Sequence, residues 1–178
     1  MTTENLSWKT WEYNFPPFFT LQPVASTRKK QIIAWGTILQ NYCMTKKLTE
    51  IDLTCEVFEN KQINRKLSNN DIQEIFLQLS QMEIVKFSAS ANESKDKVIV
   101  LYKSLSSWAD SLFTAAKNLN WTVNSVYDII NGEDTESYDF HGQSEELVLG
   151  ALVLLQNKGK CEVFYDDGGN VEGVKFFI

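Results

Sequence analysis

Two stretches of this sequence predict the same succession of elements: a helix, a shorter helix, a third helix with an N-terminal cap, and a β-hairpin. In the first stretch, Ser26-Thr27 is predicted to cap a helix whose apolar residues recur every three or four positions, and a second amphipathic pattern begins at Ser68. In the second stretch, the pattern of the third helix begins at Ser144, about 76 residues later. This is the element order of a winged helix. The sequence therefore predicts an α+β, mainly helical fold with two tandem winged-helix domains, preceded by an extended segment rich in proline and aromatic residues.

Local signals place several of these elements. Ser68-Asn69-Asn70-Asp71 and Ser107-x-x-Asp110 have the Ser-x-x-acid form of a capping box, in which two side chains satisfy free backbone N–H groups at the start of a helix. Shorter helices are predicted around Phe58, Ile63 and Leu67, and around Val126, Ile129 and Ile130 before Asn131-Gly132. The predicted hairpins pair Ile84 to Ala89 with Val98 to Tyr102, through a polar link from Asn92 to Lys97, and Cys161 to Tyr165 with Val174 to Ile178.

The domain limits that follow are residues 1–25 for the extended segment, 26–104 for the first winged helix and 105–178 for the second. The net charge of −6 is unevenly divided between the two halves. Residues 1–104 hold 13 Lys and Arg against 11 Asp and Glu, whereas residues 105–178 hold 4 against 12. Because charge of one sign attracts partners of the other, the second domain is expected to repel phosphate backbones and to attract a basic peptide or helix.

Winged helices often bind DNA through the third helix, so a tandem winged-helix transcription regulator is the alternative reading. That activity needs basic or amide side chains on the exposed face of the helix. The predicted third helices, Ser68 to Glu83 and Gln143 to Asn157, contain acidic residues and no Lys or Arg. Amide groups that could still contact base edges are those of Gln73, Gln78 and Gln81. On balance, no nucleic-acid partner is expected.

Residues that could support catalysis are scarce. His141 is the only histidine and is interpreted as a turn residue that bonds locally. Asp134, Glu136 and Asp139 near it lack the defined spacing of metal ligands, so they are interpreted as a solvated acidic loop. We therefore expect a protein that is not an enzyme, with no catalytic residue, no cofactor and no metal site.

Cysteine usage and apolar runs predict the compartment. Cys43, Cys55 and Cys161 are far apart and form no C-x-x-C pair, which is typical of buried thiols in a reducing compartment. Met1 to Asn5 show no targeting signal, and the longest apolar run, Leu147 to Leu155, is too short to cross a bilayer. The expectation is a cytoplasmic protein that meets membranes only through its partners.

Aromatic residues are concentrated between Trp8 and Phe19, a density that a free tail could not leave in water without risking aggregation. Pro16 and Pro17 restrict the backbone, so Phe18 and Phe19 are expected to follow a stiff, extended stem with little entropy left to lose. The two rings should therefore dock into an apolar pocket. Whether that pocket belongs to another protein or to the first domain of this chain is left open by the residues themselves.

These residues also carry a resemblance. The run Trp11-Glu12-Tyr13-x-Phe15-Pro16-Pro17-Phe18-Phe19-Thr20-Leu21-Gln22-Pro23 is similar to the N-terminal signature of the vacuolar protein sorting-associated protein 25 family, the small subunits of ESCRT-II. The similarity continues through Leu67-Ser68, Val126-Tyr127-Asp128, Gly132-Glu133-Asp134-Thr135, Asp139-Phe140-His141-Gly142 and Gly173-Val174-Lys175-Phe176-Phe177. It covers nearly the whole chain and is weakest from Phe87 to Lys103.

The resemblance implies a non-catalytic arm of the Y-shaped ESCRT-II complex, which holds two copies of this subunit and two larger winged-helix subunits. In that family the Pro-Pro-x-Phe segment, here Pro16, Pro17, Phe18 and Phe19, inserts into hydrophobic pockets on the larger subunits. The second winged helix recruits an ESCRT-III subunit, at the endosomal membrane, for sorting of ubiquitinated cargo into multivesicular bodies. ESCRT-III subunits have basic N-terminal helices, so Glu145 and Glu146 are nominated as their contacts.

Overall fold

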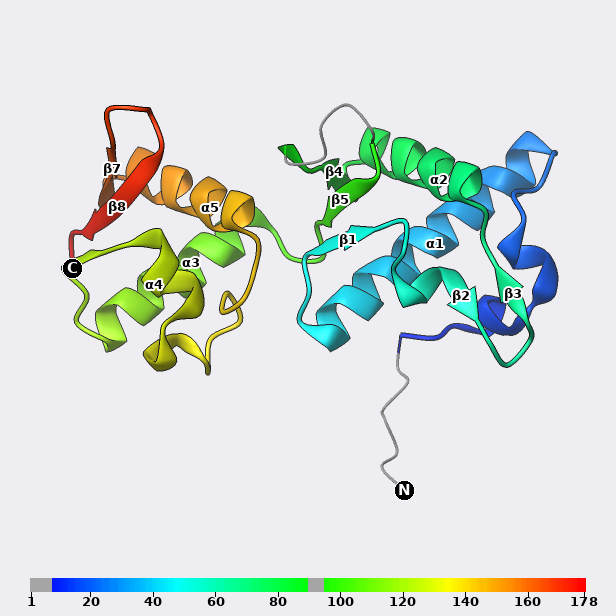
Figure 1. The fold of residues 1–178 in the computed structure, drawn as a ribbon, viewed down its shortest axis with the longest axis horizontal. Coiled ribbons are helices and arrows are strands. Elements are labelled where there is room, and N and C mark those ends of the chain that lie inside the picture. The colour runs from blue at the N-terminus through cyan, green and yellow to red at the C-terminus, as the bar shows by residue number, and fades with distance from the viewer. Residues whose placement is uncertain (1–7, 90–94) are drawn as a thin grey trace, which may run out of the picture. The chain divides into compact units, whose positions relative to one another are not determined.

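The computed structural model describes residues 8–89 and 95–178, and the chain divides into two compact units, one ending at Tyr102 and the other beginning at Lys103 (Figure 1). The break lies two residues before the position expected from the sequence. Met1 to Asn5 and the first half of the predicted link from Asn92 to Lys97 lie outside the described residues.

The first unit is built on two α-helices, α1 (Ala25–Lys46) and α2 (Asn69–Gln81). The predicted cap of α2 is confirmed, because the Ser68 hydroxyl accepts a hydrogen bond from the Asp71 backbone N–H at 3.1 Å. The cap predicted for α1 is wrong: the helix begins at Ala25, after Val24, and has no side-chain cap.

Three short strands, β1 (Glu50–Asp52), β4 (Val85–Phe87) and β5 (Lys97–Val100), form an antiparallel sheet in the order β1-β5-β4. Val98 pairs with Phe87 on one side and Ile51 on the other. The predicted first hairpin is therefore confirmed, with shorter strands than the apolar runs suggested.

The short helix predicted around Phe58, Ile63 and Leu67 is wrong. A 3-10 turn, η3 (Glu56–Phe58), leads instead into a small hairpin of β2 (Glu59–Asn60) and β3 (Arg65–Lys66). Phe58 and Leu67 are both fully buried and lie at the open end of this hairpin, where the Leu67 N–H donates to the Phe58 carbonyl at 3.0 Å. Phe58 precedes one strand of the hairpin and Leu67 follows the other, and both side chains enter the same core. Their spacing in the sequence therefore resembled that of a helix although no helix is present there.

The second unit has the predicted winged-helix order. Its strands form an antiparallel sheet in the order β6-β8-β7, with Val163 paired to Val174. The last strand begins at Val171, three residues earlier than predicted. The cap predicted at Ser107 is wrong, because Ser104 caps the helix by accepting from the Ser107 N–H at 3.1 Å. The elements are α3 (Leu105–Asn118), β6 (Val123–Asn124), α4 (Val126–Asn131), the 3-10 turn η5 (Glu133–Thr135), α5 (Glu145–Asn157), β7 (Cys161–Tyr165) and β8 (Val171–Phe176).

Each unit has its own aromatic and aliphatic interior, so the predicted fold class, α+β and mainly helical with two winged-helix domains, is confirmed. Cys43 and Cys161 are buried thiols, as expected, and Cys55 is half-buried. Burial raises the pKa of Cys43 to about 12 and that of Cys161 to about 11, so both thiols stay protonated at neutral pH. Within the described residues, no helix combines the length and the apolarity that a membrane span requires.

Candidate protein-binding surfaces

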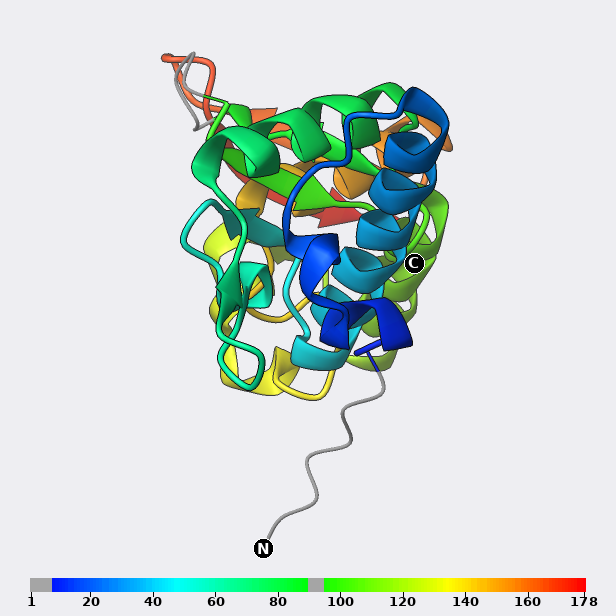
Figure 2. The same ribbon diagram turned by 90° about the vertical axis from the view of Figure 1, so that its right-hand side faces the viewer.

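The N-terminal segment folds back onto α1 as two 3-10 turns, η1 (Trp11–Asn14) and η2 (Pro16–Phe19), drawn in dark blue in Figure 2. The extended stem expected from the diproline is therefore wrong. Proline fixes a φ value that suits a 3-10 turn as well as an extended chain, and it occupies the first turn, where no N–H is needed. The turn is closed by hydrogen bonds from the Phe18 N–H to the Phe15 carbonyl at 2.9 Å and from the Thr20 N–H to the Pro17 carbonyl at 3.3 Å.

Phe18 and Phe19 lie inside the first unit and are 5% and 2% exposed. The Phe18 ring stacks on Trp35 of α1, with centroids 4.6 Å apart and planes 13° apart. Phe19 meets the same indole edge-on at 5.5 Å. The sequence left open whether the two phenyl rings dock in the first domain or in another protein. In the structure of this chain they dock in the first domain. The insertion of these rings into a partner, implied by the resemblance, stays a prediction that the free chain does not display.

The other side of the segment faces solvent. Trp11 is 73% exposed and Phe15 is 49% exposed, and their ring centroids are 6.2 Å apart. Pro16 and Pro17 are also exposed. We call Trp11, Phe15, Pro16 and Pro17 the aromatic-proline surface. Trp11 and Phe15 were not singled out from the sequence, although their four-residue spacing was a signal that the two rings share a face.

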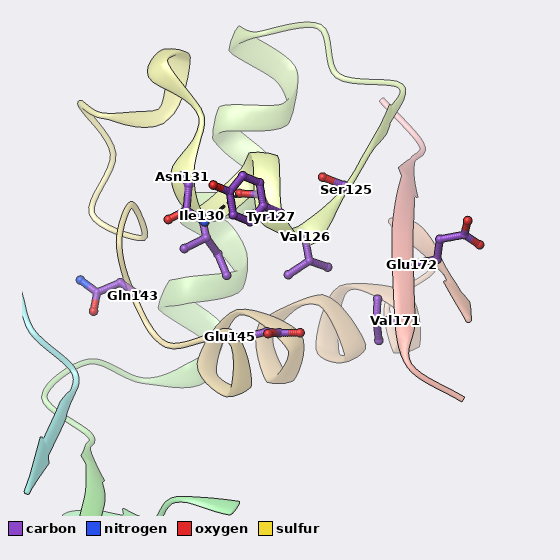
Figure 3. Close-up of a pocket in the computed structure, with 9 residues that line it drawn as sticks. All are labelled: Ser125, Val126, Tyr127, Ile130, Asn131, Gln143, Glu145, Val171 and Glu172. Atoms are coloured by element: carbon purple, nitrogen blue, oxygen red, sulfur yellow. Dashed lines mark hydrogen bonds between the residues drawn. The ribbon is translucent and has the colours of Figure 1, made fainter. Parts of the chain in front are cut away.

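In the second unit, Glu145 lies where α5 begins and lines a hollow beside α4 and β8 (Figure 3). A neighbouring hollow shares Ser125 and Glu172 with it. Glu146, the next residue in the chain, is half-buried and does not line either hollow. We call the two hollows together the acidic groove; its lining residues are Val123, Asn124, Ser125, Val126, Tyr127, Asp128, Ile130, Asn131, Gln143, Glu145, Phe164, Val171, Glu172 and Gly173.

The acidic groove combines exposed apolar side chains with negative charge. Tyr127 and Val123 are among the most exposed large apolar residues of the chain. Glu145, Glu172 and Asp128 supply carboxylates, and none of the described residues that line the groove is Lys or Arg. Such a surface is complementary to the apolar and basic faces of an amphipathic helix.

On α2, two of the three glutamine amides that could contact base edges are hydrogen-bonded within the chain. Gln73 donates to the Asp96 carboxylate at 2.8 Å, and Gln78 donates to Glu74 at 2.9 Å. Both amides are therefore engaged by carboxylates of this chain, which argues against the DNA-binding alternative.

His141 makes a local contact, as interpreted from the sequence. Its Nδ1 lies 2.8 Å from the Thr135 hydroxyl. Asp139 instead forms an ion pair with Lys103 and accepts a hydrogen bond from the Ser111 hydroxyl at 2.6 Å. In the parts of the chain that the structure describes, no three His, Cys, Asp or Glu side chains are grouped as metal ligands would be.

Comparisons with known proteins agree with the predicted resemblance. A family model described as ESCRT-II complex subunit matches residues 12–144. Vacuolar protein-sorting-associated protein 25 of Danio rerio is 38% identical over 94% of this chain and 97% of its own length. The Arabidopsis thaliana protein of that name is 32% identical, with 93% of each chain covered.

Solved structures agree as well. The crystal structure of subunit VPS25 of the endosomal trafficking complex ESCRT-II is similar with a TM-score of 0.80 and 26% identity, covering 93% of this chain and 97% of the other. A chain of the endosomal complex ESCRT-II (VPS22/VPS25/VPS36) is similar with a TM-score of 0.78 and 26% identity, covering 96% of this chain and all of that one. By sequence and by fold, over nearly its whole length, the chain belongs to the vacuolar protein sorting-associated protein 25 family of ESCRT-II complex subunits.

Proposed function

We propose that this chain is a non-catalytic scaffold subunit of an ESCRT-II complex in endosomal multivesicular body sorting. The first unit binds the two larger subunits through the aromatic-proline surface, and the second unit recruits an ESCRT-III subunit through the acidic groove. Support comes from the similarity to a chain of the complex of VPS22, VPS25 and VPS36. The protein acts in the cytoplasm and at the endosomal membrane, which it reaches through the assembled complex.

The observation that carries the first part is the exposure of two large rings on an ordered turn. Covering the exposed parts of Trp11 and Phe15 removes roughly 300 Å² of apolar surface from water, a gross gain of about 7 kcal/mol at ~25 cal/mol/Å². Pro16 and Pro17 extend the same surface and lose little entropy on binding. Aromatic anchors of this kind dominate the binding energy of protein interfaces.

Phe18 and Phe19 belong to the same binding segment with a supporting role. Their rings pack against Trp35 and so hold the turn that exposes Phe15, Pro16 and Pro17. The segment Pro16, Pro17, Phe18 and Phe19 thus remains the proposed assembly element, with the prolines outside and the phenyl rings inside.

The test of assembly is the double change of Trp11 and Phe15 to Ala. Because both rings are exposed, the variant should fold normally and fail to co-purify with the two larger subunits. Phe177→Ala is the matched control, since Phe177 is 47% exposed in the second unit and lies outside the surface. Full assembly by the double variant would refute the proposal.

The test of ESCRT-III recruitment has two arms. Removal of Leu105 to Ile178 should leave assembly with the larger subunits intact and abolish ESCRT-III binding. Glu145→Lys combined with Glu172→Lys should weaken ESCRT-III binding in the full chain, because it reverses the charge of the acidic groove. Asp167→Lys, in the exposed β7–β8 turn, is the control for charge alone. Recruitment by the truncated chain would disprove the role of the second unit.

A further inference from the structure

A buried glutamine on α1 holds the backbone of the N-terminal segment. The Gln31 side chain is 7% exposed. Its Nε2 donates to the Phe18 carbonyl and to the Thr20 carbonyl, both at 2.9 Å, and its Oε1 accepts from the Gln22 N–H at 3.0 Å. Both amide hydrogens and the carbonyl oxygen of Gln31 are therefore used on residues 18, 20 and 22. The Gln31 side chain therefore bonds to every second residue of the segment, in the way that the backbone of a neighbouring β-strand would.

Further hydrogen bonds connect Gln22 to the diproline. The Gln22 side chain donates from Nε2 to the Pro17 carbonyl and to the Thr20 carbonyl, both at 3.0 Å. Arg28 in turn donates from Nε to the Gln22 carbonyl at 2.9 Å. Gln22 is thus fixed from α1 by Gln31 and Arg28, and it transmits that position to Pro17 of the aromatic-proline surface.

A second buried amide holds the backbone of this segment at Tyr13, before Phe15 and the two prolines. Asn60 on β2 donates from Nδ2 to the Tyr13 carbonyl at 2.7 Å. The stretch from Tyr13 to Phe18, which carries Phe15 and the two prolines, is therefore held at both ends by side-chain amides of the first unit. Buried amides are costly unless all of their hydrogen bonds are made, so this arrangement specifies one conformation of the segment.

We infer that Gln31 is the positioning residue of the aromatic-proline surface, acting through Phe18 and Gln22 to preset the diproline turn for the larger ESCRT-II subunits. This inference rests on the proposed assembly function. A ligand's apparent affinity falls with the fraction of the protein in the binding-competent conformation. Removing the Gln31 amide leaves the Gln22 N–H without its acceptor. It also takes one of two donors from the Phe18 carbonyl, which keeps Trp35 Nε1, and from the Thr20 carbonyl, which keeps Gln22 Nε2. The segment is then freer to leave that conformation.

The test is Gln31→Met in the full chain, with Gln40→Met as the matched control. Gln40 lies on the same helix and donates to the Leu101 carbonyl at 3.1 Å, away from the segment. Binding to a purified complex of VPS22 and VPS36 from the same organism is measured at a temperature where both variants are folded. The dissociation constant should rise at least about tenfold for Gln31→Met and less than about twofold for Gln40→Met.

Two further readouts separate positioning from general stability. Backbone amides of residues 18–22 should exchange with deuterium faster in Gln31→Met, whereas those of α2 should be unchanged. In the Trp11→Ala background, Gln31→Met should weaken binding less than in the natural chain, because both changes act on one surface. Equal affinities of the two glutamine variants, or strictly additive effects with Trp11→Ala, would overturn the inference.

Three outcomes of these experiments lead to different conclusions. If Gln31→Met does not fold, Gln31→Glu takes its place, because it keeps the shape of the side chain and the acceptor for Gln22 while removing the two N–H donors. If Trp11→Ala binds with full affinity, the assembly proposal fails and this inference fails with it. Weak binding by Trp11→Ala together with full affinity of Gln31→Met overturns this inference alone.

Discussion

Tyr13 connects the N-terminal segment to the turn between η3 and β2. Its hydroxyl donates to the Val57 carbonyl at 3.0 Å and to the Glu59 carbonyl at 2.9 Å. Its ring is buried and meets the Phe19 ring edge-on at 5.4 Å. Burial, with a smaller effect of the Glu56 carboxylate, raises the pKa of Tyr13 well above its usual range. The phenol is therefore held in its neutral, donating form.

This pKa shift predicts a loss of stability in alkali. The unfolded chain releases the Tyr13 proton near the ordinary pKa of about 10, whereas the folded chain retains it. The stabilisation that the buried Tyr13 hydroxyl adds to the free energy of unfolding is therefore complete below about pH 10 and falls as the pH rises further. Tyr42, whose pKa burial also raises, acts in the same direction. Urea unfolding between about pH 8 and about pH 11 should show a steeper loss for the natural chain than for Tyr13→Phe. Equal slopes would contradict this assignment.

Phe18 and Phe15, three residues apart, should differ sharply in their effect on stability. Phe18→Ala removes a buried ring that is stacked on Trp35, so it should cost about 3 to 5 kcal/mol of unfolding free energy. Phe15→Ala removes a half-exposed ring and should change stability by less than about 1 kcal/mol. Thermal and urea unfolding of both variants measure the difference. A folded, fully stable Phe18→Ala chain would mean that the ring is not part of the core in solution.

Serine caps define where four of the five α-helices in the described residues begin. Ser68, Ser104, Ser125 and Ser144 each accept a hydrogen bond from the backbone N–H three residues later, at 3.0 to 3.3 Å. The exception is α1, which lacks a side-chain cap and is held by its buried residues. Capping is a local interaction, and two of these starts, at Ser68 and Ser144, were predicted from the sequence.

The stabilising effect of the Ser68 cap on α2 can be tested by substitution. Ser68→Ala should lower the unfolding free energy by about 1 kcal/mol, because the Asp71 N–H loses its acceptor. Ser68→Asn is the control, since Asn is an equally good capping residue and should retain most of the stability. Chemical unfolding of both variants measures the difference in their free energies of unfolding. The cap has no role if Ala and Asn give the same result.

The whole chain consists of two units with separate interiors and unequal charge. Trp35, Phe58 and Phe76 lie in the core of the first unit. In the second, Trp121 is in ring contact with Phe140 and Phe176. The unequal charge agrees with the proposed division of labour, in which the acidic second unit meets a basic partner helix.

Separate cores predict separable unfolding. Leu152→Ala, at a fully buried position of α5, should cost the second unit about 2 to 5 kcal/mol. The first unit, with its own contacts intact, should unfold as in the natural chain. Amide exchange followed by mass spectrometry resolves the two units along the sequence. Equal destabilisation of residues 8–102 would show that the chain unfolds as one cooperative body.

Local and repeated features of this protein were determined by its sequence alone. The tandem winged-helix order, the caps at Ser68 and Ser144 and the family resemblance all follow from neighbouring residues and their periodicity. The side on which each aromatic ring of the N-terminal segment lies was decided only by tertiary structure. Proline permits both an extended stem and a 3-10 turn, and the choice depends on Trp35 and Gln31, which belong to a different element. For the same reason Phe58 and Leu67 suggested a helix although they join a hairpin: their common core is formed by distant residues, which no local pattern contains.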